Sequence, residues 1–121
     1  MLRKKAEREE IIEKQSQGGD GALLLDHLLQ QGVLNGVKTY AKAVLEPGAS
    51  VGYHEHFGET EIYYILSGMG EYRDNQTILS VEAGDVTITR SGEGHGIKNT
   101  GHERLEFIAL IVSEIGNCKI Q

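Results

Sequence analysis

Residues 43–68, AVLEPGASVGYHEHFGETEIYYILSG, are the stretch that decides the fold. The stretch holds two short segments of strand-forming residues, 50–56 and 61–66, and turn-forming residues precede each of them. Pro47-Gly48 leads into the first segment, and the turn at 57–60 leads into the second. Short apolar segments bounded by such turns predict two strands, which we expect to form an antiparallel hairpin.

The same alternation of strand and turn extends outward along the chain. Turn signals such as Asn35-Gly36 and Asp74-Asn75 separate further short apolar segments, at 37–45, 70–73, 77–81, 86–90, 95–99 and 105–112. Short strands with a turn every 8–12 residues or so are typical of an antiparallel sandwich or barrel. A closed barrel is favoured because it leaves no exposed sheet edges. The sequence therefore predicts an all-β fold with a single core.

The first residues have a different pattern. Opposite charges four residues apart, Lys5 with Glu9 and Glu10 with Lys14, predict a short helix over 2–16. Because glycines follow at 18 and 19, we expect a helical arm over residues 1–19 and a β-barrel over 20–121. Segment 22–29 fits either a helical face or a buried strand.

Composition narrows the classes of partner and compartment. Twelve basic and 18 acidic residues give a net charge of −6, with no basic stripe, so nucleic acid is not an expected partner. No apolar run is long enough to cross a membrane, and the start lacks the apolar centre of a secretion signal. The only cysteine, Cys118, has no partner for a disulfide and is given no role, which fits the cytoplasm.

Three histidines and a glutamate stand at positions that suit a metal site. His54 and His56 are two residues apart on one predicted strand, so both rings point to the same face. Glu61 opens the next strand, and His95 opens a later one. Such a set fits one divalent transition metal ion, without distinguishing Zn, Fe, Mn, Ni or Co. On an octahedral ion it leaves two positions open for a ligand.

The glycines around these residues carry a resemblance to a known family. The first motif reads Gly48, five residues, His54, one residue, His56, four residues, Glu61, six residues, Gly68. The second reads Gly84, five residues, Arg90-Ser91-Gly92, two residues, His95, three residues, Asn99. Both resemble the motifs of the cupin superfamily, in particular small single-domain monocupins of the type called mannose-6-phosphate isomerase-like. The sequence departs at Arg90, where the family usually has proline.

The resemblance implies a double-stranded β-helix, which is a jelly-roll barrel. It also implies a metal ion held by His54, His56, Glu61 and His95, a structural role for Asn99, and a homodimer. A physical hint for the dimer is that Val51 and Tyr53 are expected to face away from the ligand side and to need cover. His27 and His102 lie outside the motifs and are interpreted as surface residues.

Alternation along the strands predicts the rest of the pocket. Tyr63 and Ile65 share the face of Glu61, Ile97 shares that of His95, and Phe107 lies on the last strand. Tyr63 and Glu59 are the candidate catalytic groups. The candidates for binding the ligand are Arg90, Ile65, Ile97 and Phe107.

Three functions remain open for such a site, all of them acting on or binding a small oxygen-rich molecule. The leading interpretation is a sugar or sugar-phosphate isomerase-like protein, in which the metal polarises a carbonyl group. The second is a metal-dependent dioxygenase, which would use the same two open positions. The third is a non-enzymatic protein that binds a small ligand through the metal. The scarcity of acid–base groups favours the third function somewhat.

Overall fold

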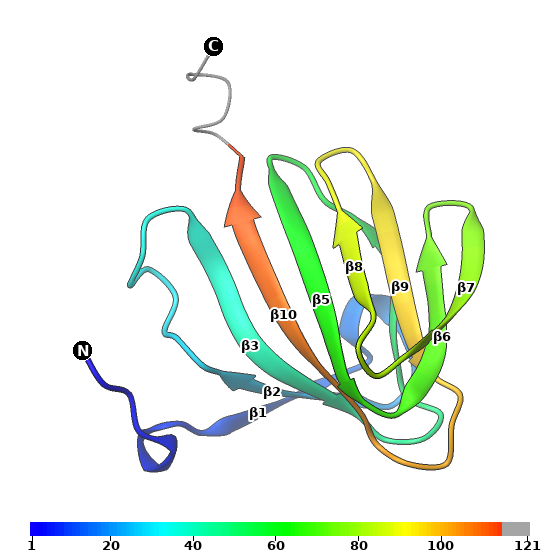
Figure 1. The fold of residues 1–121 in the computed structure, drawn as a ribbon, viewed down its shortest axis with the longest axis horizontal. Coiled ribbons are helices and arrows are strands. Elements are labelled where there is room, and N and C mark those ends of the chain that lie inside the picture. The colour runs from blue at the N-terminus through cyan, green and yellow to red at the C-terminus, as the bar shows by residue number, and fades with distance from the viewer. Residues whose placement is uncertain (115–121) are drawn as a thin grey trace.

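Two antiparallel β-sheets, packed face to face, make up the fold in the computed structural model, which describes residues 1–114 (Figure 1). One sheet has the order β1-β2-β3-β10-β5-β8 and the other has the order β4-β9-β6-β7. The strands are β1 (Glu10–Lys14), β2 (Ala22–His27), β3 (Val37–Leu45), β4 (Ser50–Glu55), β5 (Glu59–Ser67), β6 (Met69–Asp74), β7 (Thr77–Glu82), β8 (Val86–Thr89), β9 (Gly94–Asn99) and β10 (Leu105–Ser113).

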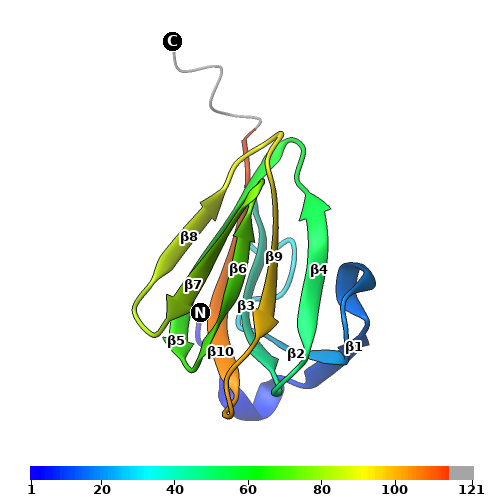
Figure 2. The same ribbon diagram turned by 90° about the vertical axis from the view of Figure 1, so that its right-hand side faces the viewer.

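Strands that are distant in the sequence lie side by side. β10 lies between β3 and β5, and β9 lies between β4 and β6. Figure 2 shows β4, β9 and β6 in front of β3, β10 and β5. This interleaved order is that of a double-stranded β-helix, so the predicted all-β fold is confirmed. The predicted β6–β7 hairpin also forms, with Asn75 in its turn at a φ of 54°.

The hairpin expected from residues 50–66 does not form. β4 pairs with β9, whereas β5 pairs with β10 and β8 in the other sheet. The chain between β4 and β5 therefore crosses from one sheet to the other. As a result, Glu61 approaches the histidines across the interior of the sandwich rather than along the same sheet.

The predicted N-terminal helical arm is wrong. The chain forms a 3-10 turn at Lys5–Glu7, then β1, then a second 3-10 turn at Ser16–Gly18. Helical charge pairs contribute only a few tenths of a kcal/mol each. Pairing of β1 with β2 satisfies backbone groups along five residue pairs, and Arg8 adds an ion pair with Asp26 at 2.8 Å. This pairing also resolves segment 22–29, whose first six residues are strand β2. No helix in residues 1–114 is long and apolar enough to span a bilayer.

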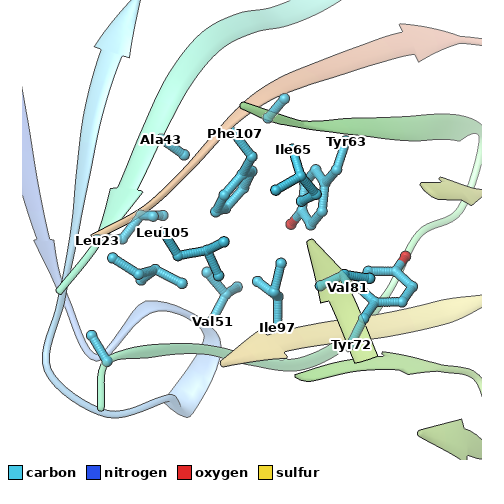
Figure 3. Packing of buried hydrophobic residues seen from close by; sticks show 13 residues of the cluster. Leu23, Ala43, Val51, Tyr63, Ile65, Tyr72, Val81, Ile97, Leu105 and Phe107 are labelled. Carbon is cyan, nitrogen blue, oxygen red and sulfur yellow. The ribbon is translucent and has the colours of Figure 1, made fainter. Parts of the chain in front are cut away.

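The core lies between the inner faces of the two sheets (Figure 3). Leu105 and Ile65, which are fully buried, come from the six-stranded sheet, and Ile97 comes from the four-stranded one. Strand alternation places these side chains inward, as predicted for Ile65 and Ile97. Asn99 ends β9 and is also buried, and its Nδ2 donates to the carbonyl oxygens of Leu45 and Glu103 at 2.8 Å each. This hydrogen bonding fits the structural role implied for it.

Val51 points inward, against expectation. It is 5% exposed and belongs to the core, where Figure 3 places it beside Ile97. The register of β4 against β9 shifts between Val51 and His54, which is a β-bulge. An extra residue in a bulge reverses the alternation, so residues three apart can share one face. Val51 therefore gives no outer apolar face, and the hint of a dimer based on it is wrong.

Candidate metal centre

The four predicted metal-ligating residues come together at one point inside the fold. His54 lies opposite His95 in the β4–β9 pair, and His56 directly follows β4. Glu61 reaches the same point from β5 in the facing sheet. One ligand atom from each residue lies within 4.8 Å of all the others. His56, Glu61 and His95 are buried, and His54 is half-buried.

The spacing of these atoms fits an ion with adjacent coordination positions. The Nε2 atom of His95 lies 3.2 Å from Nε2 of His54 and 3.1 Å from Nε2 of His56. Oε1 of Glu61 lies 3.0 Å from the His95 nitrogen and 3.1 Å from the His56 nitrogen. With metal–ligand bonds of about 2.1 Å, ligands at right angles are about 3.0 Å apart. The distances are therefore those of neighbouring corners around one ion.

Hydrogen bonds at the other ring nitrogens set the orientation of the imidazoles. Nδ1 of His54 lies 2.8 Å from the carbonyl oxygen of Gly52, and Nδ1 of His56 lies 2.6 Å from Oε2 of Glu59. A carbonyl or carboxylate oxygen only accepts, so each Nδ1 must carry the proton. Each Nε2 then presents a lone pair to the common point. This is the usual arrangement of metal-ligating histidines.

His95 is held from three sides. Its Nδ1 lies 2.8 Å from the hydroxyl of Tyr72 and 2.9 Å from that of Thr89. The ring of Tyr63 stacks on it, with centroids 4.9 Å apart and an angle of 23° between the planes. Burial lowers the pKa of His95 below its ordinary value. A neutral ring is the form that binds a metal.

Glu61 is the charged partner of the cluster. Burial alone would raise the pKa of its carboxyl group, but without metal the imidazoles of His54, His56 and His95, which donate from Nε2 when that atom is protonated, lower it well below the ordinary value. The same contact with Glu61 raises the pKa of His56, against the effect of burial. The carboxylate is therefore ionised at neutral pH, as a metal ligand must be.

A cavity of about 330 Å³ opens from this cluster toward β2 and β3. His54, His56 and Glu61 form part of its wall, together with the predicted residues Tyr63, Glu59 and Phe107. Two predicted lining residues, Ile65 and Ile97, are instead buried in the core and do not line it. Arg90 is exposed after β8 and lies away from this wall, so its role in ligand binding stays a prediction without geometric support.

Tyr63 and Glu59, the two candidate catalytic groups, both line the cavity, and their catalytic roles stay predictions. Burial raises the pKa of Tyr63 well above its ordinary value, so its hydroxyl stays protonated at neutral pH. Glu59 is occupied on both oxygens, by Nδ1 of His56 at 2.6 Å and by Nζ of Lys38 at 2.9 Å. The geometry makes Glu59 a partner that orients His56.

The sequence interpretation missed polar residues of the cavity on β1 and the following turn, which are Glu13, Ser16 and Gln17, and others at the β2–β3 side. His27, Gln31 and Thr39 line the wall there. His27 was interpreted as a surface residue because it lies outside the two motifs. Strand alternation could have identified His27, because Leu23, Leu25 and His27 share one face of β2 and all line the cavity.

Comparison with known proteins agrees with this fold and site. The sequence model of the Cupin domain family matches residues 41–111, which include all four residues of the cluster. The chain belongs to the cupin family. A curated relative from Thermotoga maritima, named oxalate-binding protein, is 48% identical over 96 residues, which are 78% of this chain and 79% of the relative.

Solved structures of cupins superpose on this chain. A Thermotoga maritima protein described as a predicted oxalate decarboxylase has a TM-score of 0.89 and 42% identity, covering 93% of this chain and 99% of its own. The cupin domain of Schizosaccharomyces pombe Cnp3 has a TM-score of 0.72 and 18% identity, covering 90% of this chain and 72% of its own. At that identity, the second likeness concerns the fold alone.

Proposed function

We propose that this cupin binds a small chelating carboxylate, of which oxalate is the simplest, through one divalent transition metal ion. The observation that carries the proposal is the convergence of three imidazole Nε2 atoms and one carboxylate oxygen at the end of a cavity. The metal would supply Lewis acidity and two adjacent open positions. His54, His56, Glu61 and His95 would hold it.

The charge of the site supports a carboxylate ligand. A divalent ion and the Glu61 carboxylate together leave a net charge of about +1 at the ligand end, which attracts an anion. A bidentate acid fills two adjacent positions without any further cation from the chain. The relative named for oxalate binding supports the same ligand chemistry.

Binding rather than catalysis is favoured by the state of the two candidate catalytic groups. A base for isomerisation needs a free, ionisable group at the ligand, yet Glu59 is engaged by Lys38 and His56, and Tyr63 stays protonated. A sugar phosphate would need a cation, and no lysine or arginine of residues 1–114 lines the cavity. A dioxygenase would require a redox-active metal, and no contact in the described site favours this function over binding.

Calorimetry with the metal-loaded protein and oxalate tests the proposal. We expect one metal per chain and saturable oxalate binding that disappears when the metal is removed. The double variant His54→Ala and His56→Ala should lose both metal and oxalate binding, whereas His102→Ala, an exposed histidine, should keep both. Unchanged oxalate binding in the double variant would refute the assignment.

We also propose that the chain forms a homodimer through the outer face of its six-stranded sheet. Apolar side chains continue in register across this face, from Val86 on β8 to Tyr64 on β5 and Ile108 on β10. A second row runs from Ile88 through Ile62 and Leu110 to Tyr40. Tyr64, Val86 and Ile88 are 46%, 59% and 44% exposed. A continuous apolar patch of this kind marks an interface.

Sedimentation tests the dimer. We expect a dimer at micromolar concentration, and Tyr64→Lys should convert it to a monomer by placing a charge on the interface. Ile78→Lys, on β7 of the other sheet, changes an apolar residue that is more exposed than Tyr64 and should leave the dimer intact. A monomeric wild-type protein would refute this part of the proposal.

A cytoplasmic location is our proposal as well. It is supported by the single cysteine of the sequence, which cannot form an intrachain disulfide. Fractionation of the source cells tests it.

A further inference from the structure

The cavity is larger than the ligand that fills the metal's open positions. A volume of about 330 Å³ holds roughly ten waters, whereas oxalate has only six heavy atoms. Along the six-stranded sheet, three strand spacings, or about 14 Å, separate β5 with Glu61 from β2 with His27. Oxalate bound at the cluster therefore leaves the far side of the cavity to water or to a longer ligand.

The wall of the cavity changes character along its length. Its middle is apolar and consists partly of small side chains, since Ala43, Ala109 and Phe107 lie between the metal cluster and β2. On β2 beyond them the wall is apolar at Leu23 and Leu25 and becomes polar at His27. Gln31, after β2, and Thr39, on β3, add polar groups near that end. A ligand that matches this sequence of surfaces has a polar head, an apolar middle and a polar tail.

His27 is the residue best placed to recognise the tail. Opposite it on β3 is Ala41, followed across β10 by Ala109 and then by Tyr63 on β5, so small residues leave space between the two ends. The Nδ1 atom of His27 is buried and has no hydrogen-bond partner within residues 1–114. An orphan buried N–H is rarer than an orphan lone pair, so we place the ring proton on Nε2. That N–H is then a donor for a ligand oxygen.

The charge of the wall selects the kind of tail. Glu13, Glu59 and Glu61 line the cavity, and no lysine or arginine of the described chain does. Glu59 is paired with Lys38, and Glu61 would be paired with the metal, whereas Glu13 is bonded to the Ser16 hydroxyl rather than to a cation. A second carboxylate at the far side would therefore meet the charge of Glu13 with no lysine or arginine on the wall to offset it. A neutral oxygen acceptor at the far end of the ligand would not be repelled by these carboxylates.

We propose that the natural ligand is a carboxylic acid with a chelating head, a short apolar chain and a neutral hydrogen-bond acceptor at its far end, and that His27 donates to this acceptor. The inference rests on the proposed function, because the metal must hold the head. Oxalate would then be a truncated ligand that occupies only the head position.

The test measures calorimetric affinities of 2-oxo acids of about five to eight carbons for the metal-loaded protein. Each length is compared with a terminal methoxy group, with the matching alkyl chain, and with a terminal carboxylate. We expect the methoxy acid of the best length to bind about threefold to tenfold more tightly than its alkyl match, as one added hydrogen bond allows. The terminal carboxylate should bind more weakly than the methoxy acid.

Variants assign the preference to His27. His27→Ala should abolish the preference for the methoxy group, His27→Gln should retain part of it, and His102→Ala should leave it unchanged. Oxalate affinity should be equal in all of these proteins, which also shows that each one is folded. No methoxy preference, or a preference that survives in His27→Ala, would overturn the inference while oxalate binding stands. Failure of oxalate itself to bind would overturn the proposed function and this inference with it.

Discussion

The hydrogen bond between His56 and Glu59 decides how one imidazole meets the metal. The Glu59 carboxylate accepts from Nδ1 of His56 at 2.6 Å and so directs the Nε2 lone pair to the centre. Partners of this kind contribute about 10-fold to 100-fold to metal affinity in proteins. We therefore expect Glu59→Ala to weaken metal binding within that range in a competition assay with a coloured chelator.

A neighbouring glutamate provides the control for this prediction. Glu55 is exposed, and in the described structure it makes no contact with the cluster. Glu55→Ala should leave the affinity unchanged. Equal losses of metal affinity in both variants would show that the effect comes from removing a negative charge near the site and not from the orientation of His56.

Three groups of the cluster have shifted pKa values, and His95, whose pKa burial lowers, costs stability as pH falls below about 6.5. The other two, His56 and Glu61, add stability over a range of pH. Without metal, the raised pKa of His56 stabilises the fold at low pH and loses its effect as pH rises through the raised value. The lowered pKa of Glu61 stabilises the fold above about pH 4.5, and this effect is lost only as pH falls through the lowered value. The metal-free protein should therefore gain most from this pair between about pH 4.5 and pH 6.5.

Metal binding has the opposite pH dependence, because each Nε2 must be deprotonated to coordinate. The difference in Tm between the metal-loaded and metal-free protein should therefore increase from about pH 6 to about pH 8. Thermal denaturation followed by circular dichroism measures it. A difference that is constant, or larger at pH 6, would contradict the assignment of the histidines as ligands.

At the scale of elements, the contact between β4 and the turn at Ser16–Gly18 depends on Gly52. A Cβ atom on Gly52 would lie 2.1 Å from the carbonyl oxygen of Gln17, which is too close for any side chain. The Gly52 carbonyl oxygen also accepts from His54. Gly52→Ala should therefore lower stability by about 1–3 kcal/mol in chemical denaturation and weaken metal binding as well.

Ser80→Ala, on the exposed edge strand β7, is the comparison for this variant. It should change the free energy of unfolding by less than about 0.5 kcal/mol. If Gly52→Ala were as stable as Ser80→Ala, the contact of this turn with β4 would not matter for the fold.

The strands also show which features of the fold can be predicted from the sequence. Strand alternation, turn residues and motif spacing were enough to predict the all-β fold and the residues that cluster. They missed the β4–β5 crossing, because a short connection between strands leads equally well into the same sheet or the facing one. These patterns also missed the bulge that turns Val51 inward, because no residue type in the sequence marks where the alternation of faces reverses.

The N-terminal strand illustrates a second limit. Residues 10–14 carry a helical pattern of charge, yet they pair with β2, because an open sheet edge offers more backbone hydrogen bonds than an isolated helix retains. His27 was missed for a related reason. Whether β2 was strand or helix stayed open in the sequence, so the face of His27 could not be assigned.

At the scale of the whole molecule, the metal centre joins the two sheets. His54, His56 and His95 come from the four-stranded sheet and its adjoining loop, and Glu61 comes from the six-stranded one. A ligand that binds only the folded chain stabilises it by about 2.7 kcal/mol when present at one hundred times its Kd. Removal of the metal with a chelator should therefore lower the Tm by several degrees.

The double variant His54→Ala and His56→Ala supplies the control for this effect. Its Tm should be the same with and without metal and chelator. A chelator that lowered the Tm of the variant as much as that of the wild type would place the stabilising metal elsewhere in the molecule.

Crystals of the protein loaded with Mn²⁺ give the most direct measurement of the centre. The anomalous difference map should show one strong peak per chain, about 2.0–2.2 Å from Nε2 of His54, His56 and His95 and from an oxygen of Glu61. A peak bound by other residues, or no peak in protein that retains manganese by elemental analysis, would contradict the account.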